Sequence, residues 1–124
     1  MIYLKLFEEF ADSKNLKIFL EELKSYNLKK GDYAIFGSAP LVVKGIINDV
    51  NDLDVIIKPS KWTFNEIGEF RTKNIEFFNN WTGFDMDELI NNSTFEHDGF
   101  TYVDIEMVLK YKRMLNRPKD KDLI

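Results

Sequence analysis

The sequence predicts an α+β domain, α/β-like in its alternation, in which helices flank a mixed central β-sheet of four to five strands. Three observations lead to this fold class. Residues 33–36 and 55–57, YAIF and VII, are short apolar runs typical of buried strands. The turn signals between them leave room for one short helix. Upstream, apolar residues recur at the spacing of an amphipathic helix, at Leu16, Phe19, Leu20 and Leu23.

Composition favours a single folded domain over residues 1–124. The chain is 44% hydrophobic and 15% aromatic, which supplies enough apolar side chains for a core. A net charge of −4 argues against a broad nucleic-acid-binding surface, which needs clustered Lys and Arg. The absence of Cys excludes disulfides and thiol nucleophiles. The first ten residues carry no signal-peptide run and no stretch suits a membrane span, so we expect a soluble, cytoplasmic protein.

The other elements follow from turn signals and apolar spacing. Residues 2–10 fit a helix or a strand, and the helix is favoured because Glu8 and Glu9 are poor strand residues. After the second strand we expect a helix capped by Ser60 and containing Trp62, Phe64 and Ile67. Then come a strand over 74–78, a turn at 81–83, a helix over 85–91, a hairpin of 93–97 and 100–105 around Asp98-Gly99, and a helix over 105–116.

Two polar signals surround the short helix between the first two strands. Gly37-Ser38 breaks the first strand, and such a turn at a helix start offers free backbone N–H groups and a hydroxyl to an anion. Asp52 and Asp54 open the second strand and share one of its faces, because side chains two apart point the same way. Two ionised carboxylates side by side invite a divalent cation. An anion site beside a metal site suits a nucleoside triphosphate.

Gly37-Ser38, thirteen further residues and then Asp52-x-Asp54 resemble the core of the nucleotidyltransferase superfamily, the DNA polymerase β-like fold. The resemblance implies that Gly37 and Ser38 hold the nucleotide phosphates and that both aspartates bind metal. It also implies a third carboxylate on a later strand.

Asp104 is the candidate for this third acid. On an expected strand over 100–105, it shares a face with Phe100 and Tyr102, and an acid in so apolar a strand is costly to bury without a positive partner. A shared metal would be that partner. Glu106 remains the alternative, because it would share the face if the strand ran two residues further.

The basic C-terminal segment extends the resemblance. Residues 117–120 read RPKD and are followed by Asp122, which is similar to a motif closing the core of many small bacterial and archaeal nucleotidyltransferases, including toxin-type ones. In those proteins the preceding helix carries a lysine near the triphosphate. Lys112 is the candidate here, with Lys110 second.

The implied reaction moves a nucleoside monophosphate from an NTP to a hydroxyl acceptor on a small molecule, a protein or an RNA. Asp52, Asp54 and Asp104 would hold one or two Mg²⁺ ions, or Mn²⁺, to activate the acceptor and neutralise the leaving pyrophosphate. Two other hypotheses stay open: a nucleotide-binding module without turnover, and a partner-binding subunit of toxin–antitoxin-like type. Packing roles are expected for His97, Trp62 and Trp81.

Overall fold

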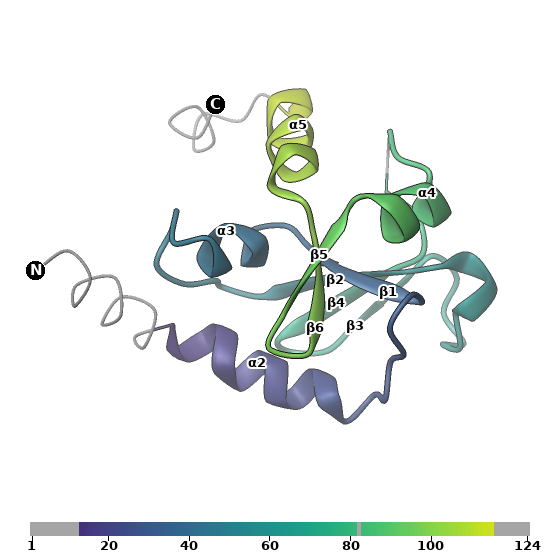
Figure 1. Cartoon of the computed structure of the whole chain (residues 1–124). Helices are drawn as coiled ribbons and strands as arrows, with labels where there is room; N and C mark the ends of the chain where they lie inside the picture. Colours follow the sequence, from purple (N-terminus) through teal and green to yellow (C-terminus); the bar gives the residue numbers. More distant parts are fainter. Residues whose placement is uncertain (1–12, 82, 116–124) are drawn as a thin grey trace, which may run out of the picture.

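Six strands form one mixed sheet in the computed structural model, which describes residues 13–81 and 83–115 (Figure 1). The strands are β1 Tyr33–Phe36, β2 Leu53–Ile57, β3 Glu69–Arg71, β4 Ile75–Phe78, β5 Thr94–His97 and β6 Phe100–Val103. They lie in the order β3-β4-β2-β1-β6-β5. β1 is antiparallel to β2 and parallel to β6, while β2 is parallel to β4. The α+β class and the mixed sheet are therefore confirmed, with one strand more than the predicted four to five.

Helices cover both faces of this sheet. They are α2 Lys14–Lys24, α3 Ala39–Val43, α4 Met86–Asn92 and α5 Ile105–Leu115, together with the short 3-10 turn η1 Pro59–Lys61. In Figure 1, α2 lies below the sheet, whereas α4 and α5 lie above it. The predicted apolar face of α2 is confirmed, because Leu16, Phe19 and Leu23 are buried.

Side-chain alternation along β2 divides the core into two clusters. Leu53, Val55 and Ile57 pack in the cluster that contains the apolar face of α2. Ile56 packs in the other cluster, which contains residues of α4 and α5. Asp54 and Ile56 are two residues apart in β2, so their side chains share a face of the strand. The Asp54 side chain therefore lies on the side of α4 and α5.

The helix predicted after Ser60 is wrong. The chain makes only the turn η1 and is already extended at Trp62, whose φ and ψ are −71° and 121°. Trp62 and Phe64, two residues apart, pack edge to face at 4.9 Å, and Phe64 stacks on Phe70 of β3 at 4.3 Å. Ile67, the third apolar residue of the expected helix face, is 99% exposed. Aromatic packing by an extended segment thus replaces the helix.

The hairpin around Asp98-Gly99 is confirmed, but its second strand is shorter than predicted. Asp98 and Gly99 have φ angles of 49° and 83°, the left-handed conformations of a tight two-residue hairpin turn. The strand ends at Val103 rather than at residue 105. The carbonyl of Asp104 already accepts hydrogen bonds from the N–H groups of Met107 and Val108, so α5 begins directly after this residue.

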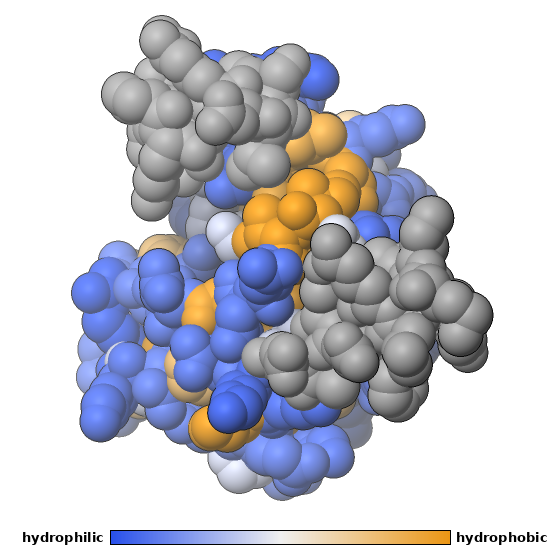
Figure 2. All heavy atoms as spheres, turned by 90° about the vertical axis from the view of Figure 1, so that its left-hand side faces the viewer, coloured by the Kyte–Doolittle hydropathy of each residue, from blue (hydrophilic) through white to orange (hydrophobic). Residues whose placement is uncertain are grey.

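Hydropathy is uneven over the side of the molecule that faces left in Figure 1. Figure 2 looks onto this side and shows one large apolar region and several smaller ones on a mainly hydrophilic surface. Ile46, which follows α3, and Met114 of α5 are 49% and 50% exposed. Among residues 13–81 and 83–115, no helix is long and apolar enough to cross a membrane. The predicted element at residues 2–10 and the motif at 117–120 lie outside the described residues.

Candidate metal centre

The turn between β1 and α3 needs glycine at position 37. Gly37 has a φ of +70°, a conformation that L side chains rarely adopt. A Cβ at this position would overlap Asp54 Oδ2 and lie 3.2 Å from Asp54 Cγ. Glycine therefore brings the turn against the Asp54 carboxylate. Ser38 follows as the N-cap residue of α3, and its side chain makes no capping hydrogen bond.

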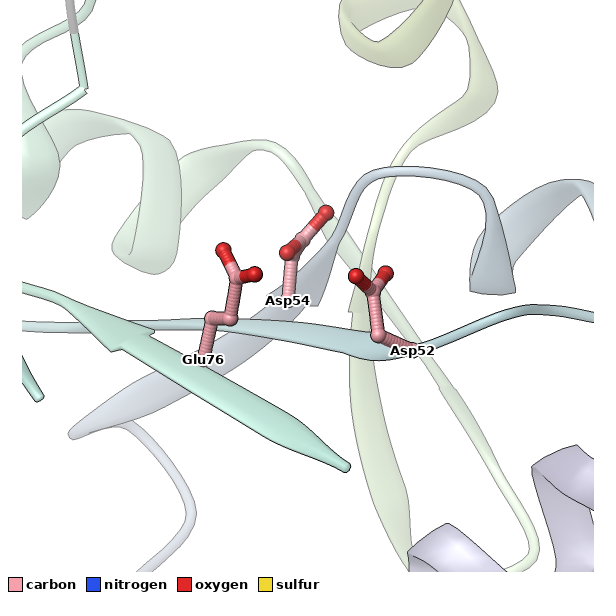
Figure 3. A group of neighbouring side chains, drawn as sticks. All are labelled: Asp52, Asp54 and Glu76. Atoms are coloured by element: carbon pink, nitrogen blue, oxygen red, sulfur yellow. The ribbon is translucent and has the colours of Figure 1, made fainter. Parts of the chain in front are cut away.

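Three carboxylates meet beside this turn. Asp52 is the last residue before β2, Asp54 lies within β2, and Glu76 lies on β4 directly opposite Asp54 in the parallel register. Each contributes an oxygen, and the three oxygens lie within 4.8 Å of one another. Figure 3 shows the three side chains rising from the same side of the sheet toward one another. Hard oxygen donors this close form a donor set suited to Mg²⁺ or Mn²⁺.

Burial and mutual repulsion disfavour full ionisation of this carboxylate cluster. The pKa of Asp54 is raised from 3.8 to about 7, mainly by burial and also by the neighbouring charges of Asp52 and Glu76, against the opposing charges of Lys112 and Arg71. Burial also raises the pKa of Glu76, while Arg71, whose Nη2 lies 3.0 Å from Glu76 Oε1, opposes that shift. A divalent cation would relieve this repulsion, so the residues present fit a metal ion.

A pocket of about 310 Å³ contains the carboxylates and the glycine turn. Its lining residues are Gly37, Ser38, Asn51, Asp52, Asp54, Glu76, Trp81, Val108, Tyr111 and Lys112. Lys112, on α5, is 5% exposed and brings a positive charge to Asp54. Five of the six predicted site residues therefore line one pocket. Lys110, the second choice for the lysine, is exposed and its Nζ lies 5.7 Å from the ring centre of Phe84.

Asp104, the sixth predicted residue, lies outside the carboxylate cluster and outside the pocket lining. Strand register explains why. Ile35 pairs with Tyr102, whereas the next residue, Phe36, pairs with Asp54, so Tyr102 and Asp54 are on opposite faces of the sheet. Even a longer β6 would have placed Asp104 on the face of Tyr102. The alternative, Glu106, is exposed on α5 and is not in the cluster either.

Glu76 is the carboxylate that sequence reasoning missed. The strand over 74–78 was predicted, and its alternation already separates Glu76 from Ile75 and Phe77, which are buried on the other side. What the sequence does not reveal is that β4 lies parallel to β2 with Glu76 opposite Asp54. An acid between two strongly apolar strand residues was the available signal.

Trp81 has a packing role, as predicted, and also lines the pocket. Its ring stacks on Phe36 with centroids 4.7 Å apart and an interplanar angle of 8°. Phe78 and Tyr111 contact it edge to face at 4.9 and 5.1 Å. Of these rings, those of Trp81 and Tyr111 line the pocket, so packed aromatic side chains form part of its wall.

Comparisons with protein-family models, with curated proteins and with solved structures found no match for this chain.

Proposed function

We propose that the protein is a divalent-cation-dependent nucleotidyltransferase, which moves a nucleoside monophosphate from an NTP to a hydroxyl acceptor on a small molecule, a protein or an RNA. The observation that carries the proposal is the meeting of Asp52, Asp54 and Glu76 in one pocket with the Gly37-Ser38 turn and Lys112. Acidic oxygens suit a cation, whereas the turn and the lysine suit phosphate, and an NTP bound with its cation needs both.

Asp52, Asp54 and Glu76 would hold the cation, with Glu76 taking the role that the resemblance to nucleotidyltransferases assigns to a third carboxylate. When bound, the cation would activate the acceptor hydroxyl and neutralise negative charge on the pyrophosphate. The acceptor hydroxyl would lose its proton to solvent, and its oxygen would form a bond to the α-phosphorus as the bond to the pyrophosphate oxygen breaks. No side chain of the protein needs to form a covalent bond with the nucleotide.

The remaining pocket residues would position the nucleotide. The Ser38 hydroxyl and the backbone N–H groups after Gly37 are donors suited to phosphate oxygens. Lys112 is already buried beside Asp54, and its ammonium group would neutralise one phosphate charge. Reactions of this kind are accelerated mainly by positioning and charge stabilisation, which a rigid sheet-based site can supply.

The test combines calorimetry and turnover. We expect a non-hydrolysable ATP analogue to bind in the presence of Mg²⁺ and to bind much more weakly without it. Labelled NTPs incubated with a panel of hydroxyl acceptors should give labelled product and pyrophosphate. Asp54→Asn should abolish cation-dependent binding and product, whereas Asp104→Asn, a matched change outside the cluster, should leave both intact.

The outcomes separate the hypotheses. Cation-dependent binding without product from any NTP would favour a nucleotide-binding module. Absence of cation-dependent binding in the wild-type protein would overturn the proposal. Loss of binding in Asp104→Asn but not in Asp54→Asn would show that the cluster described here is not the metal centre.

A further inference from the structure

The three carboxylates are not held in place in the same way. Asp54 and Glu76 lie within β2 and β4, and their strands pair with each other in parallel. Asp52 precedes β2, at the end of the loop that leaves α3, and is exposed. The sheet therefore fixes two members of the cluster, and some other contact must fix the third.

The loop before Asp52 is attached to the N-terminal end of α2. The Asp49 carboxylate accepts hydrogen bonds from the backbone N–H groups of Asn15 and Leu16, with distances of 3.0 and 3.1 Å. Ser13 Oγ donates to the carbonyl of Asn48 at 2.8 Å, and Asn15 Nδ2 donates to the carbonyl of Val50 at 2.8 Å.

Asp49 thus caps a helix that is distant in sequence. An N-cap side chain normally accepts from the second and third residues of its helix, which in α2 are Asn15 and Leu16. Ser13, the residue at the N-cap position, makes no side-chain capping bond, and the first turn of α2 contains no acidic residue. Asp49 supplies both the missing acceptor and the negative charge that a helix N-terminus favours.

The four hydrogen bonds between residues 48–50 and residues 13–16 form a clamp. This clamp restricts the residues that follow it. Asp49 Oδ1 also accepts from the N–H of Val50, and the Val50 side chain is 3% exposed in the same core cluster as Leu16. On the other side, the N–H of Leu53 donates to the carbonyl of Asn74 at 2.9 Å and starts β2. Only Asn51 and Asp52 lie between these two fixed points, and both line the pocket.

We infer that Asp49 is a positioning residue for the metal centre, acting through the N-terminus of α2 to hold Asp52 against Asp54 and Glu76. The inference rests on the proposed function, since it assumes that these carboxylates bind a divalent cation. Residues that orient metal ligands without touching the metal commonly have a large effect on metal affinity, of about ten-fold or more when they are lost.

The experiment measures Mn²⁺ affinity of the full chain by calorimetry. We expect Asp49→Ala to weaken Mn²⁺ binding roughly ten-fold, as is typical when an orienting partner is lost. Asp85→Ala is the matched control, because Asp85 caps α4 by accepting from the Glu88 N–H at 3.1 Å and does not line the pocket. This control also removes a helix cap, and its Mn²⁺ affinity should equal that of the wild type.

A double-mutant cycle distinguishes positioning from general loss of stability. If Asp49 acts through Asp52, then Asp49→Ala should have no further effect on Mn²⁺ affinity in an Asp52→Asn background. An equal loss in both backgrounds, or unchanged affinity of Asp49→Ala, would overturn the inference. Should Asp49→Ala fail to fold, Asn15→Ala, which removes only the bond to the Val50 carbonyl, is expected to weaken Mn²⁺ binding in the same direction.

Amide hydrogen exchange tests the clamp independently of metal. We expect the N–H groups of Asn51 and Asp52 to exchange faster in Asp49→Ala than in the wild type, while those of Asp54 and Glu76 stay unchanged. If the N–H groups of Asn51 and Asp52 exchanged at the same rate in Asp49→Ala as in the wild type, the clamp would be contradicted. Faster exchange in a protein whose wild type binds no Mn²⁺ would instead uphold the clamp and overturn the proposed function.

Discussion

The backbone of Gly37 lies directly against the carboxylate of Asp54, with no space between them for a β-carbon. The glycine that bends the chain after β1 and the acid at the centre of the sheet are therefore one structural unit. Because Phe36 pairs with Asp54 across β1 and β2, the strand register itself sets this approach. Any change at residue 37 must move the carboxylate that the proposed cation would touch.

Gly37→Ala should therefore damage both stability and cation binding. The positive φ and the overlap with Asp54 predict a loss of roughly 2–4 kcal/mol in the free energy of unfolding. Gly45→Ala is the control, because Gly45 has a φ of +77° but no atom within 4 Å of the added Cβ. It should cost only about 1 kcal/mol and leave Mn²⁺ affinity unchanged. Urea unfolding measures the stability and calorimetry the Mn²⁺ affinity. If both variants lost equal amounts of stability and affinity, the close approach of Gly37 to Asp54 would not have the expected role.

Glu76→Gln should weaken Mn²⁺ binding about ten-fold or more, since it removes one charged ligand from the cluster. Glu69→Gln is a matched control. Glu69 also pairs with Arg71, at 3.2 Å, but it is exposed on β3 and is not part of the cluster. Calorimetric titration with Mn²⁺ measures the affinity of both variants. If Glu69→Gln lost as much affinity as Glu76→Gln, the general field around Arg71 rather than ligation would be responsible.

Lys112→Met should raise the pKa of Asp54 above its value of about 7, because the Lys112 charge lowers that pKa in the wild type. The affinity for an ATP analogue should fall as well, since the proposed phosphate contact is lost. NMR titration of the Asp54 carboxyl carbon and calorimetry report the two effects. Lys110→Met, which changes an exposed lysine of the same helix, should change neither the pKa of Asp54 nor the affinity for the ATP analogue. An unchanged Asp54 pKa in Lys112→Met would contradict the assigned contact.

Stability without metal should fall as pH rises. The pKa of Asp54 is 3.8 in its ordinary state and about 7 in the fold, so the folded protein binds more protons than the unfolded chain between these values. The free energy of unfolding should decrease from about pH 4 to about pH 7 and level off above it. The decrease due to Asp54 is of the order of 4 kcal/mol at most.

Two controls check the origin of this pH dependence. Asp54→Asn removes the titrating group, so this part of the slope should disappear and the variant should exceed the wild type in stability at pH 8. Mg²⁺ should stabilise the wild type more at pH 8 than at pH 5.5, because the cation competes with protons for the carboxylates. Thermal unfolding at several pH values measures both, and a wild-type slope retained in Asp54→Asn would assign it to other groups.

Local patterns were sufficient wherever a segment is shaped mainly by its own residues. The four apolar residues of β1 and the amphipathic spacing of α2 were predicted correctly. So was α4, where the Asp85 side chain caps the helix by accepting from the Glu88 N–H. The Asp52-x-Asp54 pair was also found from sequence, because the spacing of two predicts one face, although β2 itself begins only at Leu53.

Prediction failed where the outcome depends on which strands become neighbours. Nothing local distinguishes Glu76 from Asp104 as the third acid, because the choice is made by the parallel pairing of β4 with β2 and by the pairing of Ile35 with Tyr102. Asp104 was favoured in part because the predicted strand continued past Val103, where the chain in fact turns into α5. The dependence of Asp52 on Asp49 was hidden for the same reason, since a cap from a distant loop leaves no local pattern.

The order of the pocket residues along the chain has a consequence for synthesis. All three acids belong to the segment that ends with β4, whereas Lys112 belongs to α5, which follows the β5–β6 hairpin. A ribosome therefore releases the anionic half of the pocket well before the lysine that faces it. A nascent chain paused after β4 already has all three acids of the cluster, but the buried lysine whose charge opposes theirs is added only when translation has produced α5.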